Sequence, residues 1–478
     1  MDEIAHLWGC LTGVLDAPEV RAVTVDLAAD EVLPSVFRVG TAAAAAVGTA
    51  TLAAAVFGAE RESGPGAAPP PVQVGLREAG IAIRSERYLR LAGRSATFWE
   101  PLSGDYPTSD GWIRLHANFP HHAAAACRAL GVAPEREAVA AALLDRLAVD
   151  AEQAVIDAGG AAGALRTAQE WADHPQSAAV AARPVIDLRP VVTGADGEGL
   201  ASGRWGGRSG GRSRRAGRPL AGLRVLDLTR VIAGPVAGRV LTSWGADVLA
   251  VRAPHLPTVA WTDLDTGFGK RLRLLDLRDG DDHAAFLELV GRAHVVLQSY
   301  RPGALDRLGL GAAELAAVRP GLGHVSVSAY GDTGPWAGRR GFDSLVQLVT
   351  GIAHEGALAA GSDRPVPLPA QVLDHVAGWL AAAAVVETVR RARRLGGSWC
   401  GDVTLAGVAG WLGGLGRVEP SQVAATPDPG LDDVADLLST LRTPAGELRY
   451  VRPPGRIDGV APVWESASPL PFPPAAEA

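Results

Sequence analysis

One aspartate, Asp374, stands where a Pro-rich stretch, residues 365–373, gives way to an unbroken helical run over 379–394. This change of pattern predicts that Asp374 lies at or near the N-terminus of a long helix, where free amides and the helix dipole favour a negative charge by ~0.3–1 kcal/mol. A carboxylate held there is a candidate nucleophile. The same place also suits an ordinary helix N-cap, a far commoner role for aspartate, so the neighbouring segments have to decide.

A second candidate site is the loop formed by Val231, Ile232 and Ala233, which follows an apolar run at 224–228 and precedes a Gly-Pro pair that opens a helix. In open α/β sheets such a loop lies at the carboxyl edge, where ligands bind. The loop lacks the GxGxxG pattern of dinucleotide-binding turns, which disfavours NAD.

Cations at the ends of successive strand and helix units predict an anionic ligand at the same edge. Each of them taken alone is more often a solvated surface charge. The four candidate cations are Lys270, Arg271, Arg301 and Arg307.

Continuous apolar runs alternate with helical patterns over residues 219–345, which predicts an α/β fold with a Rossmann-like parallel sheet buried on both faces. With the helix that follows Asp374, this pattern defines a large domain over 219–415. The expected strands are 224–228, 247–251, 295–298 and 324–328.

A smaller α+β domain is predicted over residues 83–190. An Asp-Gly turn at 110–111 before alternating apolar residues indicates a hairpin, and three helical patterns follow it. The pair His121 and His122 has no third ligand at metal spacing, so we expect a solvated helix start there and no metal site.

Residues 1–82 repeat the order of parts found in 349–415: a long Ala-rich helix, a Gly turn and then a strand. We interpret this region as a degenerate partial copy of the large-domain unit. Between Glu31 and Glu60 it has no acidic residue, so we expect one reactive centre per chain, at Asp374.

Two further segments complete the chain. Residues 191–218 are rich in Gly, Ser and Arg, which predicts a linker because such a composition cannot bury a core. Residues 416–478 form a Pro-rich C-terminal segment that is expected to wrap back over the molecule, with a helix at 431–441 and a strand at 446–451.

The composition excludes several classes of protein. The chain has 478 residues, a net charge of −7 and three widely spaced cysteines. These values predict a cytoplasmic protein without a disulfide framework, a nucleic-acid partner or a membrane partner. An apolar span at 40–59 is mostly Ala, Gly and Thr, which indicates a tightly packed internal helix.

Several motifs, in order, resemble the family III CoA-transferases, which include formyl-CoA and carnitine CoA-transferases. The small-domain stretches 106–115 and 152–189 resemble the same family, but they precede the large domain here, so the domain order is rearranged. The large-domain segments that carry the resemblance are 219–230, 233–235, 245–248, 270–271, 300–309, 328–335 and Asp374 with Gly378.

This resemblance implies a family III CoA-transferase fold and an enzyme that moves CoA between an acyl-CoA and a free carboxylic acid. Asp374 would form a covalent intermediate, and amides of the 231–233 loop or of Gly378 would stabilise the oxyanion. The four cations would meet CoA phosphates. CoA thioester is then a substrate, no cofactor is permanently bound, and a homodimer is expected.

Two other functions stay open at this point. An α-methylacyl-CoA racemase needs a His/Asp pair, but Phe342 occupies the position of its histidine. A catalytically degenerate acyl-CoA-binding protein would explain the inert first copy and the rearranged order. Retention of Asp374 among the candidate cations argues against that reading.

Overall fold

The computed structural model describes residues 2–14, 17–26, 32–192 and 218–469. At its centre is a seven-stranded sheet in the order β11-β10-β9-β12-β13-β14-β8, parallel except for the antiparallel edge strand β8. This sheet confirms the predicted α/β class. Its strands are β8 (Asp187–Pro190), β9 (Arg224–Asp227), β10 (Asp247–Arg252), β11 (Arg271–Leu274), β12 (Val295–Gln298), β13 (Gly323–Ser328) and β14 (Trp399–Thr404).

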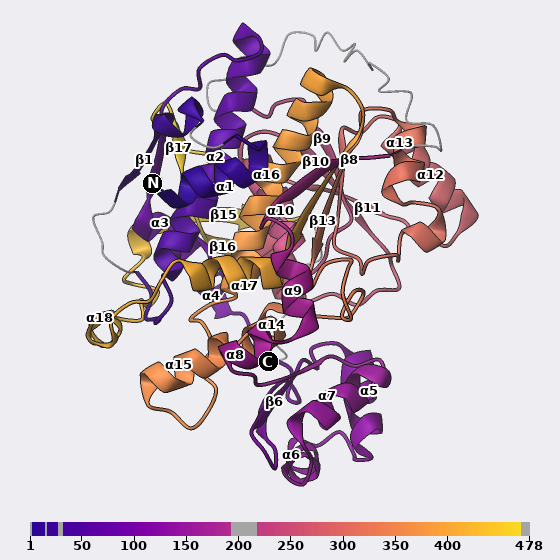
Figure 1. The fold of residues 1–478 in the computed structure, drawn as a ribbon. Helices are drawn as coiled ribbons and strands as arrows, with labels where there is room; N and C mark the ends of the chain where they lie inside the picture. Colours follow the sequence, from indigo (N-terminus) through magenta and orange to yellow (C-terminus); the bar gives the residue numbers. More distant parts are fainter. Residues whose placement is uncertain (1, 15–16, 27–31, 193–217, 470–478) are drawn as a thin grey trace.

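Helices cover both faces of the sheet (Figure 1). Alternate strand residues point to opposite sides, so that Val225 joins the core under one helix layer and Leu226 the core under the other. The first layer contains α2 (Val39–Ser63), α10 (Ala233–Ser243) and α16 (Val372–Leu395), and the second contains α12 (Gly280–Val290) and α13 (Ala312–Val318).

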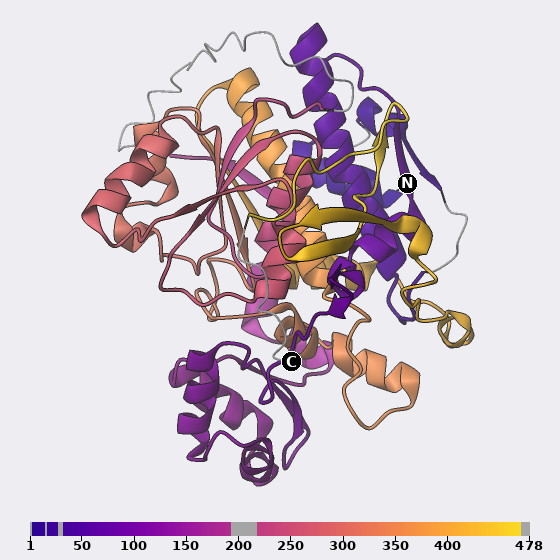
Figure 2. The same ribbon diagram turned by 180° about the vertical axis from the view of Figure 1, so that it is seen from behind.

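A smaller unit lies below the sheet in Figure 2 and has its own hydrophobic core, built from residues between Leu102 and Ala162. That core is narrower than the predicted range 83–190, because the flanking segments join other sheets. The unit consists of β5 (Gly104–Pro107), β6 (Trp112–Leu115), β7 (Ala162–Ala164), α5 (Pro120–Leu130), α6 (Arg136–Leu144) and α7 (Ala148–Asp157).

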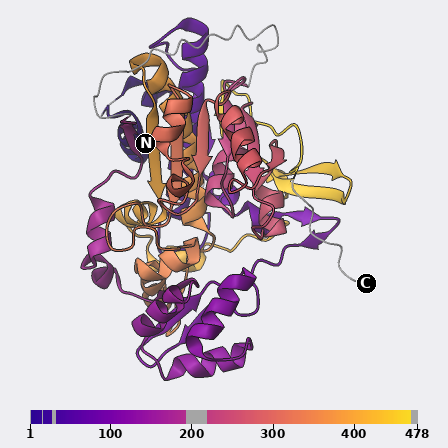
Figure 3. The ribbon, with the colours of Figure 1, turned by 90° about the vertical axis from the view of Figure 1, so that its right-hand side faces the viewer.

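The C-terminal segment pairs with strands from the first part of the chain. Strands β15 (Leu438–Thr443) and β16 (Gly446–Val451) form a hairpin that stands out in Figure 3, and β16 also pairs with β3 (Arg90–Leu91). The helix predicted at 431–441 is wrong, because only the short η3 (Ala435–Leu437) precedes β15 and cross-strand pairing overrides the local helical pattern.

The two longest helices, α2 and α16, lie against each other in the first layer. By length and composition both are able to cross a membrane, but the apolar windows are 89% buried in α2 and 100% buried in α16, as in core helices of globular proteins. Arg390 of α16 forms a buried ion pair of 2.8 Å with Glu60 of α2. The absence of a membrane partner stays a prediction.

Shorter elements connect these parts. The predicted linker 191–218 falls almost entirely outside the described residues. The remaining elements are α1 (Asp2–Thr12), η1 (Pro18–Ala22), β1 (Val23–Asp26), β2 (Val72–Gly75), α3 (Leu76–Ala82), α4 (Ser85–Tyr88), β4 (Arg94–Ser95), α8 (Ala168–Ala172), α9 (Pro175–Ala181), α11 (Ala260–Thr266), η2 (Asp306–Leu308), α14 (Asp343–Val349), α15 (Ile352–Ala360), α17 (Leu405–Gly414), α18 (Pro420–Ala425) and β17 (Arg456–Ile457).

Candidate active site

Asp374 lies on the first turn of α16, three residues after the N-cap Gln371, as the change of pattern predicted. Its side chain lines a cavity of about 350 Å³ although the residue is only 8% exposed. The first turn is capped from outside by Asp343, whose Oδ2 accepts a hydrogen bond of 3.0 Å from the Asp374 amide. Asp343 therefore takes the capping role at this turn, and Asp374 is left to line the cavity.

Burial and neighbouring charge both act on the two carboxyl groups. Burial raises the pKa of Asp374 well above its ordinary value, and the negative charges of Asp343 and Glu86 raise it further. Burial also raises the pKa of Asp343, to about 6, although amides of α16 and Gln347 counteract this by donating to its carboxylate. The raised pKa values favour the protonated forms of both carboxyl groups, and Asp374 has to be ionised before it can act as a nucleophile.

The loop of Val231, Ile232 and Ala233 lines the same cavity. Val231 has a φ of 71°, a left-handed conformation that a β-branched residue rarely adopts. Ile232 is the N-cap of α10 and Ala233 begins it, so the first amides of this helix, which have no intrahelical partner, belong to residues that line the cavity. Strained backbone of this kind concentrates at functional sites.

Gly378 does not have the predicted role of an oxyanion donor. It lies in the second turn of α16, where helix geometry places its amide in an intrahelical hydrogen bond. A Cβ at this position would come within 2.5 Å of the Ala233 carbonyl oxygen and 2.7 Å of Val236. Gly378 therefore permits close packing of α10 on α16, which brings the 231–233 loop to Asp374.

Lys270 lies in the interior and lines neither the Asp374 cavity nor the second cavity described below. Its side chain is fully buried and forms a 2.7 Å ion pair with Asp227, and it also donates to the carbonyl oxygen of Pro235. Burial lowers the pKa of Lys270 to about 8 although Asp227 opposes this. The predicted phosphate contact is replaced by a structural one, which anchors the start of α10 to β9.

The other three predicted cations separate. Arg271 pairs with Asp247 at the amino end of β10, and so lies at the edge of the sheet opposite the cavity. Arg307 lies exposed on η2 and lines neither this cavity nor the second one described below. Of the four predicted cations, only Arg301 lines the cavity with Asp374.

Sequence reasoning missed most of the basic residues around Asp374. The cavity is also lined by Arg230, Arg339 and Arg340. Arg230 directly precedes the strained loop and Arg340 stands shortly before α14, so a search for basic residues beside the motifs would have found both.

The small unit contributes two histidines to the cavity, His121 and His122. The expectation of a solvated helix start is wrong for His122, which is 4% exposed and has no hydrogen-bond partner for Nδ1. Burial lowers the pKa of His122 to about 3, and His121 and nearby arginines lower it further, so its imidazole is neutral. No local pattern shows that α5 reaches Asp374, because this contact depends on how the small unit docks.

Phe342 lines the cavity beside these histidines and stacks on His116 with ring centroids 3.5 Å apart. A phenyl ring cannot take up a proton, so this position supplies no acid–base group to the cavity.

A buried polar contact from the first part of the chain supports the segment that carries Asp374. Glu86 of α4 lies 2.9 Å from Nε2 of His375, the residue after Asp374. Beside it, Ser85 contacts Asp265, which pairs with Arg239 of α10 at 2.6 Å. These contacts tie α4, α10 and α16 together around the candidate nucleophile.

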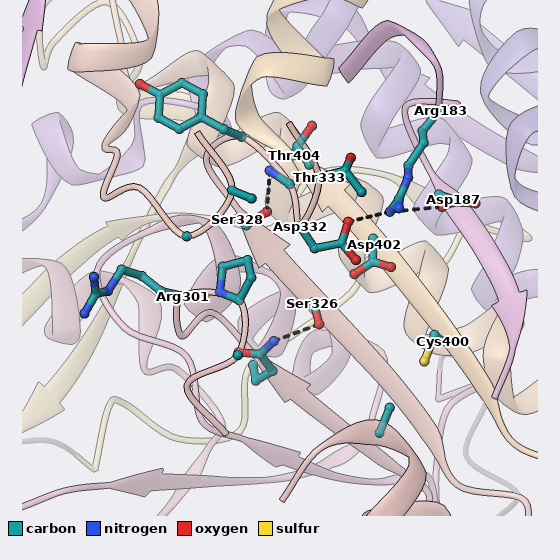
Figure 4. Close-up of a pocket in the computed structure, with 18 of the residues that line it drawn as sticks. Arg183, Asp187, Arg301, Ser326, Ser328, Asp332, Thr333, Cys400, Asp402 and Thr404 are labelled. Atoms are coloured by element: carbon teal, nitrogen blue, oxygen red, sulfur yellow. Dashed lines mark hydrogen bonds and ion pairs between the residues drawn. The ribbon is translucent and has the colours of Figure 1, made fainter. Parts of the chain in front are cut away.

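A second cavity, of about 500 Å³, lies beside β13 and β14 and shares Arg301 and Ser328 with the first. In Figure 4, Arg183 points toward Asp332, and Arg301 lies on the opposite side of the pocket. The Arg183 and Asp332 side chains form a 2.8 Å ion pair. Within the described ranges, no group of acidic, histidine or cysteine side chains is arranged to hold a metal ion.

Comparison with known families identifies the fold. The profile of CoA-transferase family III matches residues 29–200 and 220–414. The match covers well over half of the chain, so the protein belongs to CoA-transferase family III. Both halves of the match contribute strands to the central sheet, since β8 comes from the first and the other six strands from the second.

Curated relatives match over part of their length. The probable fatty acyl-CoA transferase Rv3272 of Mycobacterium tuberculosis is 33% identical over 192 residues, covering 37% of this chain and 48% of the relative. The acetyl-CoA:oxalate CoA-transferase of Acetobacter aceti is 39% identical over 145 residues, covering 28% of this chain and 37% of the relative. This chain thus spans less than half the length of either relative.

A crystal structure of Rv3272 is similar to 41% of this chain and 58% of its own, with 33% identity and a TM-score of 0.38.

Proposed function

We propose that the protein is a CoA-transferase that exchanges CoA between an acyl-CoA and a free carboxylic acid, with Asp374 as the nucleophile. The observation that carries this proposal is the position of Asp374, which lines the same cavity as the 231–233 loop with its strained residue Val231. The capping of α16 by Asp343 leaves the Asp374 carboxyl group available for chemistry.

The reaction follows from the nucleophile. Ionised Asp374 attacks the thioester carbonyl, the C–S bond breaks, and a mixed anhydride and the CoA thiolate form. The thiolate attacks the aspartyl carbonyl, which releases the donor acid and leaves an aspartyl-CoA thioester. The acceptor carboxylate repeats the two steps in reverse, so that Asp374 is regenerated and the new acyl-CoA leaves. Covalent catalysis replaces one difficult exchange with easier steps.

The loop amides and Arg301 have supporting roles. Each attack places negative charge on a carbonyl oxygen, which amides at the N-terminus of α10 stabilise. Arg301 borders both cavities and is assigned to a CoA phosphate. A homodimer in the cytoplasm remains our expectation for the assembly and its location.

Mass spectrometry after incubation with acetyl-CoA or succinyl-CoA tests the proposal. Hydroxylamine trapping is expected to convert one carboxyl group per chain to a hydroxamate, on the peptide that contains Asp374. The Asp374→Asn variant is the control and is expected to remain unlabelled. A label on a different peptide, or none with any acyl-CoA tested, contradicts the assignment; binding of CoA without any label would indicate a binding protein.

Racemisation of an α-methylacyl-CoA is a second candidate, because His122 brings a neutral imidazole with an unpartnered Nδ1 into the cavity of Asp374. The two groups would exchange a proton at the α-carbon from opposite sides. Uptake of deuterium at that carbon in D2O, lost in His122→Gln but not accompanied by a label on Asp374, would favour this function over transfer.

A further inference from the structure

The charges that line the Asp374 cavity are strongly one-sided. Four arginines line the cavity, and Asp374 is the one acidic residue among its described lining residues. Burial lowers the pKa of both lining histidines, His121 and His122, and so favours their neutral forms. Of the four guanidinium groups, that of Arg339 is compensated, since it forms a 2.8 Å ion pair with Glu152. The other three belong to Arg230, Arg301 and Arg340.

None of these three guanidinium groups forms an ion pair with a carboxylate in the part of the chain that the structure describes. Arg230 contacts neutral groups, the Pro257 carbonyl and the ring of Phe119 at 5.6 Å, and Asp263 attracts it only from beyond ion-pair distance. Burial lowers the pKa of Arg340, and the positive charge of Arg301 lowers it further.

The three groups surround one region of the cavity. Each of them helps to lower the pKa of His122, so all three lie within electrostatic range of the same imidazole. Arg230 precedes the loop that edges the cavity, and Arg340 lies three residues before Asp343. Both are therefore attached to segments that bracket Asp374.

The second cavity is balanced by contrast. Apart from Arg301, which it shares with the first cavity, its arginines face carboxylates. Arg183 forms a 2.8 Å pair with Asp332 (Figure 4), and Arg189 forms a 2.9 Å pair with Asp187. Like charges gathered in a half-buried space are unfavourable unless an anion joins them. The Asp374 cavity, whose three arginines have no carboxylate partner among the described residues, is thus the one suited to bind an anion.

We propose that Arg230 and Arg340 bind the distal carboxylate of a dicarboxylic acid, while its other carboxylate reacts at Asp374. Planar guanidinium groups suit a carboxylate, which two of them can grip with paired hydrogen bonds. The cavity, at about 350 Å³, lies at the small end of the usual range for ligand pockets, which suits a short acid. This inference rests on the proposed transferase function, since it names the acid that the transferase uses.

Calorimetric binding tests the proposal without turnover. Succinate is expected to bind the wild-type protein at least ~10-fold more tightly than butyrate, an acid of equal chain length with one carboxylate, because only succinate reaches both charges. Arg340→Met and Arg230→Met are each expected to remove this preference. Arg278→Met, which removes an exposed guanidinium group paired with Asp276 outside both cavities, is the matched control and is expected to retain it.

Binding of CoA distinguishes the two sources of an anion. The proposal expects the Kd of CoA to change less than ~2-fold in Arg340→Met. If that variant weakens CoA and leaves succinate unchanged, the anion is a CoA phosphate and the inference is overturned. Arg340→Lys, which keeps the charge but loses the planar fork, is a second variant and is expected to bind succinate with intermediate affinity.

Equal affinity of the wild type for succinate and butyrate also overturns the inference. The proposed function fails separately: a protein that prefers succinate but gives no hydroxamate at Asp374 retains the dicarboxylate site and loses the transferase assignment.

Discussion

Helices α2 and α16 have the same construction and different surroundings. Each follows an N-cap residue with nearly the same backbone angles, φ −75° and ψ 62° at Arg38 and φ −77° and ψ 60° at Gln371. Each ends at a glycine with positive φ, Gly64 or Gly396. Each is then followed by a strand that leads without a break into a helix, β2 into α3 and β14 into α17.

Counting from the two N-caps places Thr41 where α16 has Asp374. The segment before α2 pairs with a segment near the C-terminal end of the large domain. Phe37 forms a β-bridge with Arg417, and the Val418 amide donates to the Val36 carbonyl. The start of α16 instead borders a cavity lined by basic side chains. The two helices are thus built alike, but α2 is a supporting helix and α16 carries the candidate nucleophile. The surroundings of the first helical turn account for this difference.

The largest expected effect concerns the residues at equivalent positions in the first turns of α16 and α2. Asp374→Asn is expected to lower CoA-transfer turnover by at least ~10³-fold, because the amide cannot form the anhydride. Thr41→Ala is the matched change in α2 and is expected to leave turnover within ~2-fold, because Thr41 lies outside both cavities. Steady-state rates measure both; an active Asp374→Asn variant would remove the distinction between the helices.

The ion pair between the helices is expected to govern stability. Arg390→Met leaves the buried carboxylates of Glu60 and Glu387 without this partner, which is expected to cost ~3–5 kcal/mol in the free energy of unfolding. Arg394→Met removes a longer contact to Glu60, 3.9 Å, from a side chain that is 53% exposed, and is expected to cost less than ~1 kcal/mol. Urea denaturation of both variants measures the difference; equal costs would show that the helices do not depend on the buried pair.

The pH dependence of stability is expected to differ between wild type and Asp374→Asn. The folded-state pKa of Asp374 is raised above its unfolded value, so the wild-type carboxyl group loses stabilisation as pH rises from about 4 toward that raised pKa. Asp374→Asn is therefore expected to have the higher melting temperature at pH 8, with the advantage shrinking as pH falls toward 4. Calorimetric melting curves test this, with Thr41→Ala as the control that shows no such trend.

Turnover of the wild type is expected to rise with pH over the same interval, because only ionised Asp374 attacks the thioester. A flat profile of turnover against pH would contradict the raised pKa of Asp374.

The smallest expected effect concerns Glu86, which touches His375 from α4. Its negative charge helps to raise the pKa of Asp374, so Glu86→Gln is expected to move the rise in turnover to lower pH and to change the maximal rate by ~10-fold or less. A structural role alone would lower stability without moving the profile. Glu62→Gln, an exposed change at the end of α2, is the control and is expected to leave the profile in place.

The sequence by itself determined the features that depend on local pattern. Apolar runs set the strands β9, β10, β12 and β13, since buried parallel strands need continuous apolar residues. The change from a Pro-rich stretch to a helical pattern placed Asp374 on a first helical turn, and the ordered motifs identified the family. These signals lie within a few residues of each other, so they can be read without the fold.

Tertiary structure alone decided the chemistry around Asp374. Burial and the charge of Asp343 raise the pKa of Asp374, and docking of the small unit brings His122 to the cavity. The close packing of α10 on α16 is what requires a glycine at Gly378. Lys270 looked like a ligand-binding cation and became a buried partner of Asp227. Charges and pKa values depend on groups distant in the chain that folding brings within a few ångströms, and no local pattern contains those distances.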